Sequence, residues 1–282
     1  MDQIVMKPKE EMLASAGGAK IFVRSWRPQG QPRAAIVICH GVNSHGGQYI
    51  WAAEQLSADG YAVYALDLRG RGKSEGERFY VEDVKEYVAD VSTVINKAKA
   101  NDPGLPVFLL GHSAGGVVSC TYALDNQSQL AGLICESFAF KVPAPDFALG
   151  IIKRLSGFAP RLKVLTLHNK DFTRDPKALA ALNNDPLIKN ERQPAKTVAA
   201  LVRADERLKR EFPKITLPVL IMHGTVDKAT MPQGSQFFYD TAGSRDKTLK
   251  LYDGHFHDLL ADLGKEGVMA DIKKWIAKRV PA

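Results

Sequence analysis

The stretch "VFLLGHSAGGVVS", residues 107–119, decides the fold of this chain. An apolar run leads into the turn "GHSAG" (111–115), and a helical pattern follows. A G-x-S-x-G turn between a strand and a helix holds its serine in a sharp, strained bend above the sheet. Glycine on both sides leaves room for neighbouring backbone, and the helix start offers N–H groups to developing negative charge. The stretch therefore predicts that Ser113 is an activated nucleophile.

Apolar runs of strand length recur along the chain and alternate with helical patterns. The runs are "AAIVIC" (34–39), "YAVYAL" (61–66), "VFLL" (107–110), "LAGLIC" (130–135), "PVLIMH" (218–223) and "KTLKLY" (247–252), after a hairpin signal around Gly17-Gly18. Helical patterns occupy residues 49–59, 84–100, 114–125, 232–241 and 258–279. This alternation predicts an α/β fold in which helices cover both faces of a mostly parallel central sheet. Ligands of such sheets bind at the carboxyl ends of the strands.

One connection, residues 136–217, is far longer than a crossover between parallel strands requires. It contains helical pieces, among them "TVAALVRADERLKREF", separated by prolines. We therefore expect a helical cap over residues 141–212, inserted into an α/β core made of residues 1–140 and 213–282. The apolar residues of its first piece either line a substrate pocket or pack the cap against itself. They are Phe147, Ile151, Leu155 and Phe158.

A serine hydroxyl attacks a carbonyl only with the help of a base, which an acid must orient. In folds with this turn the chain order is serine, acid, histidine. Asp227 follows the strand 218–223, and "DGHFH" (253–257) follows the strand 247–252, so both loops open on the edge that carries Ser113. Asp227 is the predicted acid, and Glu136, which also ends a strand, is the alternative.

The segment "CHGVNSHGGQY" (39–49) follows the first long apolar strand. Its His-Gly turn can place a backbone N–H opposite the serine turn. The predicted donors to an oxyanion are then the N–H groups of Val42 and Ala114. We expect His40 and His45 to stabilise this loop rather than to react.

The basic excess of the chain lies in its middle. The net charge is +7, and residues 141–215 hold 16 Lys and Arg against 8 Asp and Glu. These charges are interleaved with other residues, so they form either a solvated helical surface or a basic face toward anionic substrates or membranes, not a nucleic-acid arm. "LRGRGKSEG" (68–76) lacks the first glycine of a phosphate loop, and no acids and histidines stand at metal-ligand spacing. No nucleotide, other cofactor or metal is therefore predicted.

Three observations bear on the compartment. No window approaches the ~18 apolar residues of a membrane span, and the N-terminus lacks the pattern of a signal peptide. The three cysteines, Cys39, Cys120 and Cys135, lie in apolar stretches, which argues against a disulfide framework. We expect a cytoplasmic protein.

The chain resembles the α/β-hydrolases of the monoacylglycerol lipase, lysophospholipase and related serine esterase group. The matching segments, in family order, are "GAKIFVRSWRP", "HGVNSHGGQY", "DLRGRGKSEG", "GHSAGG", "TRDPKALAALNNDPL", "HGTVDK" and "DGHFHDLL". The resemblance implies Ser113 as nucleophile, Asp227 as acid, and Val42 and Ala114 as oxyanion donors. Its Gly-x-x-His pattern places the base at His257, so that His255 occupies a position usually held by an apolar or small residue.

The resemblance also implies a helical cap over an apolar acyl pocket. Glu136-Ser137 stands where the family has a pair of small residues, and with Phe138 and Phe140 it is expected to reshape the pocket floor. The predicted function is hydrolysis of a carboxylic ester, most similar to that of a monoacylglycerol lipase, with a lipid or small-molecule ester as partner. Amide cleavage or acyl transfer by the same triad is a second reading, and a binding module without catalysis is a third.

Overall fold

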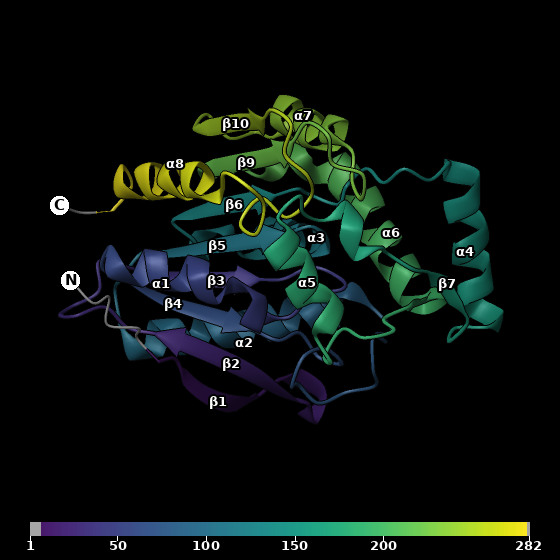
Figure 1. The fold of residues 1–282 in the computed structure, drawn as a ribbon, viewed down its shortest axis with the longest axis horizontal. Helices are drawn as coiled ribbons and strands as arrows, with labels where there is room; N and C mark the ends of the chain where they lie inside the picture. The colour runs from purple at the N-terminus through teal and green to yellow at the C-terminus, as the bar shows by residue number, and fades with distance from the viewer. Residues whose placement is uncertain (1–6, 281–282) are drawn as a thin grey trace.

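The computed structural model describes residues 7–280 and has an eight-stranded sheet at its centre (Figure 1). The strand order is β1-β2-β4-β3-β5-β6-β9-β10. The hairpin strands β1 (Lys9–Ala14) and β2 (Lys20–Trp26) are antiparallel at one edge, and the pairs from β4 to β10 are parallel. The α/β fold with a mostly parallel sheet is thereby confirmed.

The central strands are apolar because both of their faces are covered. Every residue of β3 (Ala34–Cys39), β4 (Tyr61–Leu66), β5 (Val107–His112), β6 (Gly132–Glu136) and β9 (Val219–Gly224) is buried, whereas the edge strand β10 (Lys247–Tyr252) is not. A strand buried on both faces cannot alternate apolar and polar residues, which explains the continuous runs in the sequence.

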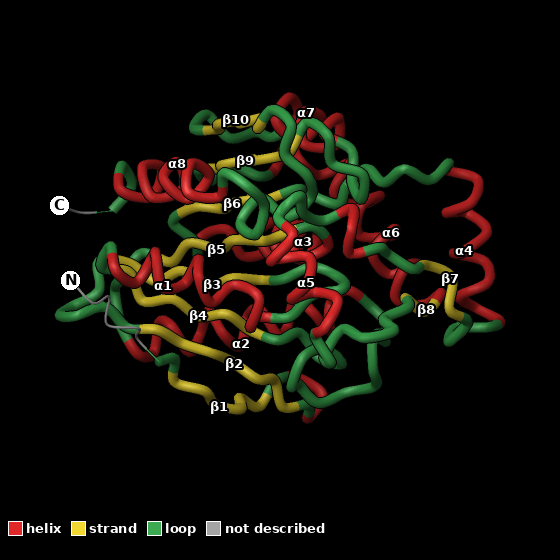
Figure 2. The backbone as a smooth tube through the Cα atoms, viewed as in Figure 1, coloured by secondary structure: helices red, strands yellow, loops and turns green. Residues whose placement is uncertain are grey.

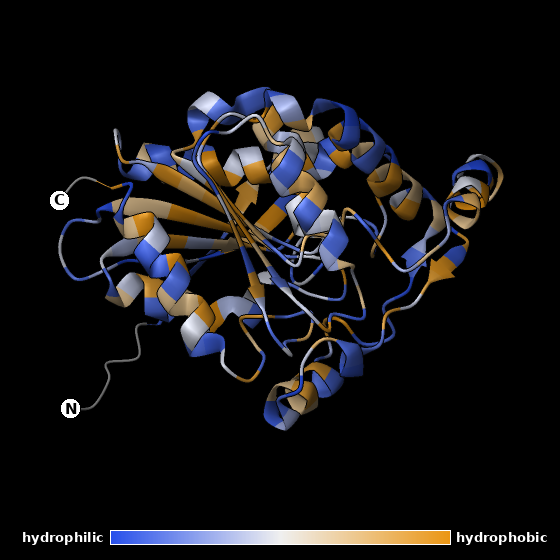
Figure 3. Cartoon of the chain, turned by 90° about the horizontal axis from the view of Figure 1, so that it is seen from above, coloured by the Kyte–Doolittle hydropathy of each residue, from blue (hydrophilic) through white to orange (hydrophobic). Residues whose placement is uncertain are grey.

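Helices cover the two faces of the sheet. α1 (Ile50–Ala58) and α8 (Lys265–Ala277) share one buried cluster with the sheet, and α2 (Val84–Asn101), α3 (Ala114–Asn126) and α7 (Pro232–Thr241) share the other. Figure 3 shows the mostly apolar strands enclosed between helices whose outer faces are hydrophilic. The predicted helices at 49–59, 84–100, 114–125 and 232–241 are confirmed to within a few residues.

The predicted helix 258–279 is wrong at its start. α8 begins only at Lys265, and residues 258–264 form turns instead. Leu259 and Leu260 are buried in the core cluster of α8, so their apolar pattern reflects burial from a turn rather than a helical face. Gly264, with a φ of 90°, ends this irregular segment.

The segment between β6 and β9, where the sequence predicts a cap, is called the inserted segment below (Figure 2). It contains α4 (Asp146–Phe158), β7 (Lys163–Leu165), α5 (Pro176–Asn184), β8 (Gln193–Pro194) and α6 (Ala195–Glu211). α4 packs on α6 and stands on the side of the molecule away from both termini (Figure 1). α6 belongs partly to the core, because its Ala204 and Leu208 lie in the same buried cluster as α2 and α3.

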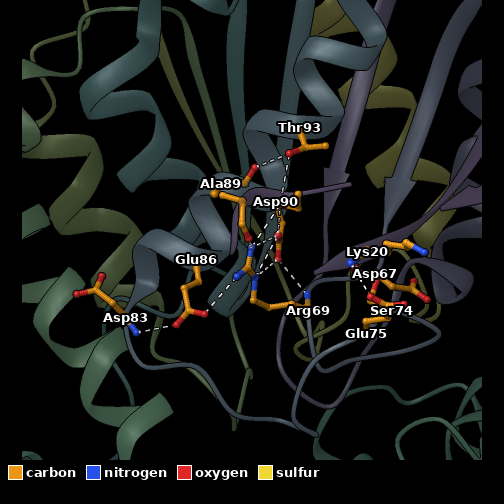
Figure 4. A network of polar contacts seen from close by, with 12 residues as sticks. Lys20, Asp67, Arg69, Ser74, Glu75, Asp83, Glu86, Ala89, Asp90 and Thr93 are labelled. Carbon is orange, nitrogen blue, oxygen red and sulfur yellow. Dashed lines mark hydrogen bonds and ion pairs between the residues drawn. The ribbon is translucent and has the colours of Figure 1, made fainter. Parts of the chain in front are cut away.

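The turn after β4 is held by a buried polar network (Figure 4). Arg69 donates from Nη2 and Nε to the two oxygens of Asp90 in α2, at 2.6 and 3.0 Å. Asp67 accepts the backbone N–H groups of Gly46 and Lys73, at 2.7 and 2.8 Å. The segment that resembled a phosphate loop is therefore a turn that doubles back on itself and stabilises the neighbouring loop.

None of the helices in residues 7–280 combines the length and the apolar character needed to cross a membrane.

Candidate active site

Ser113 occupies the turn between β5 and α3 in a backbone conformation that few residues adopt. Its φ and ψ are 55° and −123°, and such strain costs on the order of 1–3 kcal/mol and concentrates at functional sites. A methyl group at Gly111 would lie 2.5 Å from the carbonyl oxygen of Gly115, and one at Gly115 would lie 2.2 Å from that of Cys39. Both glycines are therefore required by close backbone contact.

The loop after β3 lies directly against Ser113. A methyl group at Gly41 would lie 3.3 Å from Ser113 Oγ. His40 stabilises this loop, because its Nδ1 lies 2.7 Å from the Gly41 carbonyl oxygen and its Nε2 accepts the Leu68 N–H at 3.0 Å. Burial, followed by the charge of Arg71, lowers the pKa of His40 well below its usual value. The ring therefore stays neutral and keeps both contacts.

Val42 follows Gly41, which lies against Ser113, and Ala114 follows Ser113 itself, so the predicted oxyanion donors stay a prediction that these positions suit. Within the part of the chain that the structure describes, the N–H of Val42 donates to no other residue, whereas that of Asn43 is already taken by Glu191. Ala114 is the first residue of α3, where a helix leaves its N–H groups unpaired. These are the two donors that the sequence predicts.

Asp227 lies just beyond β9 and is surrounded by donors. Its Oδ1 accepts the N–H groups of Ala229 and Thr230, at 2.8 and 2.9 Å. Its Oδ2 lies 2.7 Å from Nδ1 of His257 and 3.0 Å from Nε2 of His223. Burial favours the neutral acid, but the electrostatic interaction with His257 and the hydrogen bond with His223 outweigh it and lower the pKa of Asp227. The carboxylate is therefore held ionised.

His257 has one nitrogen committed and one free. Because Nδ1 faces the carboxylate of Asp227, it carries the proton, and Nε2 is left as an acceptor. Nε2 is buried and has no hydrogen-bond partner among the described residues. The ring of His112, which precedes Ser113, packs on that of His257 with centroids 4.9 Å apart. The catalytic contact between Ser113 and His257, for which no hydrogen bond is formed, stays a prediction.

Sequence reasoning missed His223. Its Nδ1 lies 2.7 Å from Ser235 Oγ, so the ring is held between α7 and the carboxylate of Asp227. The available signal was its position at the end of an apolar strand, four residues before Asp227. His255, by contrast, packs on Tyr252 with centroids 5.6 Å apart, and it forms no contact with Asp227. Of the two histidines in "GHFH", only His257 meets the acid.

The predicted pocket residues are dispersed. Phe138 is fully buried in the core, where its ring packs against Phe140, Phe212 and Phe238, and therefore presents no surface to a substrate. Phe147, Ile151 and Phe158 in α4 are 73%, 53% and 91% exposed. Leu155 is partly buried. No side chain of this set lines the pocket described next.

A pocket of about 550 Å³ opens between the loop after β3 and the inserted segment. Leu182 and Ile188 line it and share a buried apolar cluster with Phe172, whose ring packs on that of His257 at 5.0 Å. The remaining lining is largely polar. It consists of Asn43, Thr166, Leu167, His168, Asn169, Lys170, Leu179, Asn183, Lys189, Asn190 and Glu191. The lining thus contains both apolar and polar side chains, and it includes Asn43, which follows the predicted oxyanion donor Val42.

Comparison with known proteins assigns this site to a family. The family model Hydrolase_4, described as serine aminopeptidase S33, matches residues 30–264. The chain belongs to this family. It is 34% identical to human monoglyceride lipase over 272 residues, which cover 95% of this chain and 90% of the relative.

Two further relatives share the fold and length of the chain. Monoacylglycerol lipase of Mycolicibacterium smegmatis is 31% identical over 96% of this chain and 98% of the relative. A solved monoglyceride lipase of Saccharomyces cerevisiae, in complex with a substrate analog, superposes with a TM-score of 0.88 at 26% identity. That match covers all of this chain and 98% of the yeast chain. The chain is therefore an α/β-hydrolase along its whole described length.

Proposed function

We propose that this chain is a serine esterase that hydrolyses monoacylglycerols or closely related lipid monoesters. The observation that carries the proposal is the arrangement around Ser113. A strained serine turn lies against the Gly41 loop, the Asp227–His257 pair leaves one ring nitrogen free, and the ring of His112, which precedes Ser113, packs on that of His257. Carboxylic ester hydrolysis is the chemistry that these groups supply together.

The reaction follows from the proton positions. Ser113 Oγ attacks the ester carbonyl carbon while its proton passes to Nε2 of His257, and Asp227 stabilises the imidazolium that forms. The N–H groups of Val42 and Ala114 hold the oxyanion, and loss of one such donor typically costs roughly 3–4 kcal/mol in the barrier. His257 then protonates the leaving alcohol, and water hydrolyses the acyl-enzyme by the same steps.

The substrate class is supported by the relatives and by the pocket. A monoester of glycerol has one long apolar arm and one end rich in hydroxyl groups. The pocket is lined by apolar side chains, including Leu182 and Ile188, and by amide side chains, including Asn183 and Asn190, which belong to a residue type that can hydrogen-bond hydroxyl groups. The two relatives described above, which cover 96% and 95% of this chain, are named monoacylglycerol lipase and monoglyceride lipase.

We also propose that the inserted segment contacts lipid surfaces. Exposed apolar side chains cluster on α4 and on the segment that follows it, namely Phe147, Ile151, Phe158, Leu162 and Leu165. Arg154 and Lys163 are exposed on the same segment, and neither belongs to an ion pair in residues 7–280. Apolar side chains flanked by cations suit the interface of an anionic membrane.

The proposed compartment is the cytoplasm. The three cysteines are buried free thiols, and Cys120 and Cys135 lie with their sulfur atoms 3.6 Å apart without a disulfide. Adjacent unlinked thiols suit a reducing environment.

A substrate panel tests the function. Nitrophenyl esters of increasing chain length, monoacylglycerols and the matching aryl amides would be compared, since the family description raises amide cleavage as the second candidate. Esters should exceed amides, with monoacylglycerols among the best substrates. Ser113→Ala should lower turnover by about 10⁶ while leaving the fold intact. Faster turnover of amides than of esters would contradict the esterase assignment. Activity in the Ser113→Ala enzyme would show that Ser113 is not the nucleophile.

A further inference from the structure

A buried pair of carboxyl groups lies behind the segment that carries His257. Glu136 ends β6 and is fully buried, and Asp258 is 7% exposed. An oxygen of each and a ring nitrogen of His112 all lie within 4.8 Å of one another. No Lys or Arg in residues 7–280 forms an ion pair with either carboxyl group. Two carboxylates in such a place would repel each other without a nearby cation to offset them.

His112 does not supply the missing positive charge. Its Nδ1 lies 2.8 Å from the hydroxyl of Tyr49, whose pKa is raised well above its usual value by burial, so this hydroxyl stays protonated and donates. Nε2 of His112 then carries the proton and lies 3.3 Å from the carbonyl oxygen of His257. Burial, with a contribution from His257, lowers the pKa of His112 to about 3. The ring is neutral, and with both nitrogens engaged it has none left to bind a metal ion.

Glu136 uses only one of its oxygens. Oε1 accepts the N–H of Leu260 at 3.1 Å, and Oε2 is buried without a partner among the described residues. A buried, unpaired carboxylate oxygen is costly, whereas a protonated one can donate to a carboxylate beside it. Burial, and then the charge of Asp258, raises the pKa of Glu136 well above its usual value.

We propose that Glu136 stays protonated in the working enzyme and shares its proton with Asp258. Through that proton and the Leu260 hydrogen bond, Glu136 acts as a positioning residue for the segment that carries His257. The proposal rests on the proposed catalytic role of His257. When the shared proton is lost as the pH rises, the two carboxylates repel, the segment after His257 shifts, and turnover falls.

The other titratable groups around the pair do not take over this role. Burial raises the pKa of both tyrosines, Tyr49 and Tyr252, so both hydroxyl groups stay protonated near neutral pH. Among the described residues, the titratable groups around the pair include Tyr49 before α1, His112 at the end of β5, Tyr252 at the end of β10, and His257 and Asp262 in the loop before α8. Ionisation of the Glu136–Asp258 pair is thus the change that we expect to alter the position of His257.

The test compares Glu136→Gln with Glu136→Ala, using a soluble short-chain ester in a pH-stat. Glutamine keeps the Leu260 acceptor and cannot ionise, so it should hold turnover within about threefold of the parent near pH 7 and remove the alkaline loss. Alanine leaves the Leu260 N–H unpaired and should lower kcat about tenfold or more at every pH, with little change in KM. An unchanged alkaline limb in Glu136→Gln, or losses as large as those of Glu136→Ala, would overturn the proposal.

Infrared spectroscopy provides a readout that does not need activity. The parent enzyme near neutral pH should show the C=O band of a protonated carboxyl that is missing in Glu136→Gln. Asp205 in α6, whose pKa is also raised well above its usual value by burial, calls for an Asp205→Asn control. That variant should lose a different band and keep the parent's pH profile. If the C=O band of the protonated carboxyl remained in Glu136→Gln, the proposal would be wrong even if that variant were unstable.

The same set of proteins separates this proposal from the proposed function. His257→Ala and Asp227→Asn should lose ester hydrolysis whatever happens at Glu136. If they do and Glu136→Gln behaves like Glu136→Ala, the esterase assignment stands and the shared proton is wrong. If the parent hydrolyses no ester, the esterase assignment fails and the infrared bands still decide the protonation of Glu136.

Discussion

The backbone N–H of Asn43 donates to the carboxylate of Glu191 at 2.7 Å, across the boundary between the sheet core and the inserted segment. Arg71, in the turn after β4, pairs with the same carboxylate, and both side chains are about 1% exposed. Because Asn43 follows the predicted oxyanion donor Val42, the inserted segment holds the loop that forms the site.

Glu191→Gln should destabilise the whole fold. Glutamine can still accept the Asn43 N–H, but it leaves the buried charge of Arg71 uncompensated, which typically costs about 3–5 kcal/mol. Denaturant unfolding would measure this. As a control, Asp246→Asn breaks the more exposed pair with Arg279 and should cost less than about 1 kcal/mol. Equal losses of unfolding free energy in the two variants would show that the buried pair stabilises the fold no more than the exposed pair.

His257→Ala should fall to near background, a loss of about 10⁶ in turnover on a short-chain ester. His255→Ala should keep measurable turnover, because His255 packs on Tyr252 and does not contact Asp227. Steady-state kinetics of both variants, with thermal melts to verify folding, would check this. The opposite pattern would mean that the loop after β10 presents the other histidine to Ser113.

The sequence was sufficient where chemistry follows from local geometry. The turn around Ser113 and the succession of strands along the chain depend on contiguous residues. For this reason β5, α3 and the placement of Asp227 after β9 could all be predicted. The start of α8 could not. Leu259 and Leu260 have the spacing of a helical face, and only the fold shows that they enter the core from a turn.

Contacts between distant segments were beyond prediction for a different reason. Glu191 and Asn43 are separated by 148 positions, and Glu136 and Leu260 by 124. The residues adjacent to each in the sequence therefore do not indicate its hydrogen-bond partner. The pattern of α4 correctly indicated residues that share a helical face. It did not indicate what covers that face, and most of that face turned out to be exposed rather than lining a pocket.

Phe147→Ser should therefore separate two kinds of substrate. The side chain is 73% exposed, so its loss should leave hydrolysis of soluble esters and thermal stability nearly unchanged. Turnover of monoacylglycerol presented in anionic vesicles should fall, because less apolar surface enters the interface. Met12→Ser, at a 42% exposed position on the distant strand β1, is the matched control. Equal activity of the two variants on vesicles would exclude α4 from membrane contact.

Asp258→Asn should change how stability depends on pH, with a sign set by burial. Burial raises the pKa of Asp258 to about 6, against the opposing charge of His257; the unfolded chain has the ordinary value near 3.9. Below about pH 4 both states hold the proton, and the stabilising contribution is fully present. Between about pH 4 and 6 only the folded state holds it, so the free energy of unfolding falls by roughly 1.4 kcal/mol per pH unit. Asparagine removes this slope, so the parent should lose stability relative to the variant across that window and no further above it. Denaturant unfolding at half-unit steps of pH would measure the difference.

Asp125→Asn provides a control of opposite sign, because the hydrogen bond from Arg207 lowers the pKa of Asp125 and the contribution is lost as the pH falls. A parent-minus-variant difference for Asp258 that stays flat from pH 4 to 6 would show that this carboxyl holds no extra proton in the folded protein.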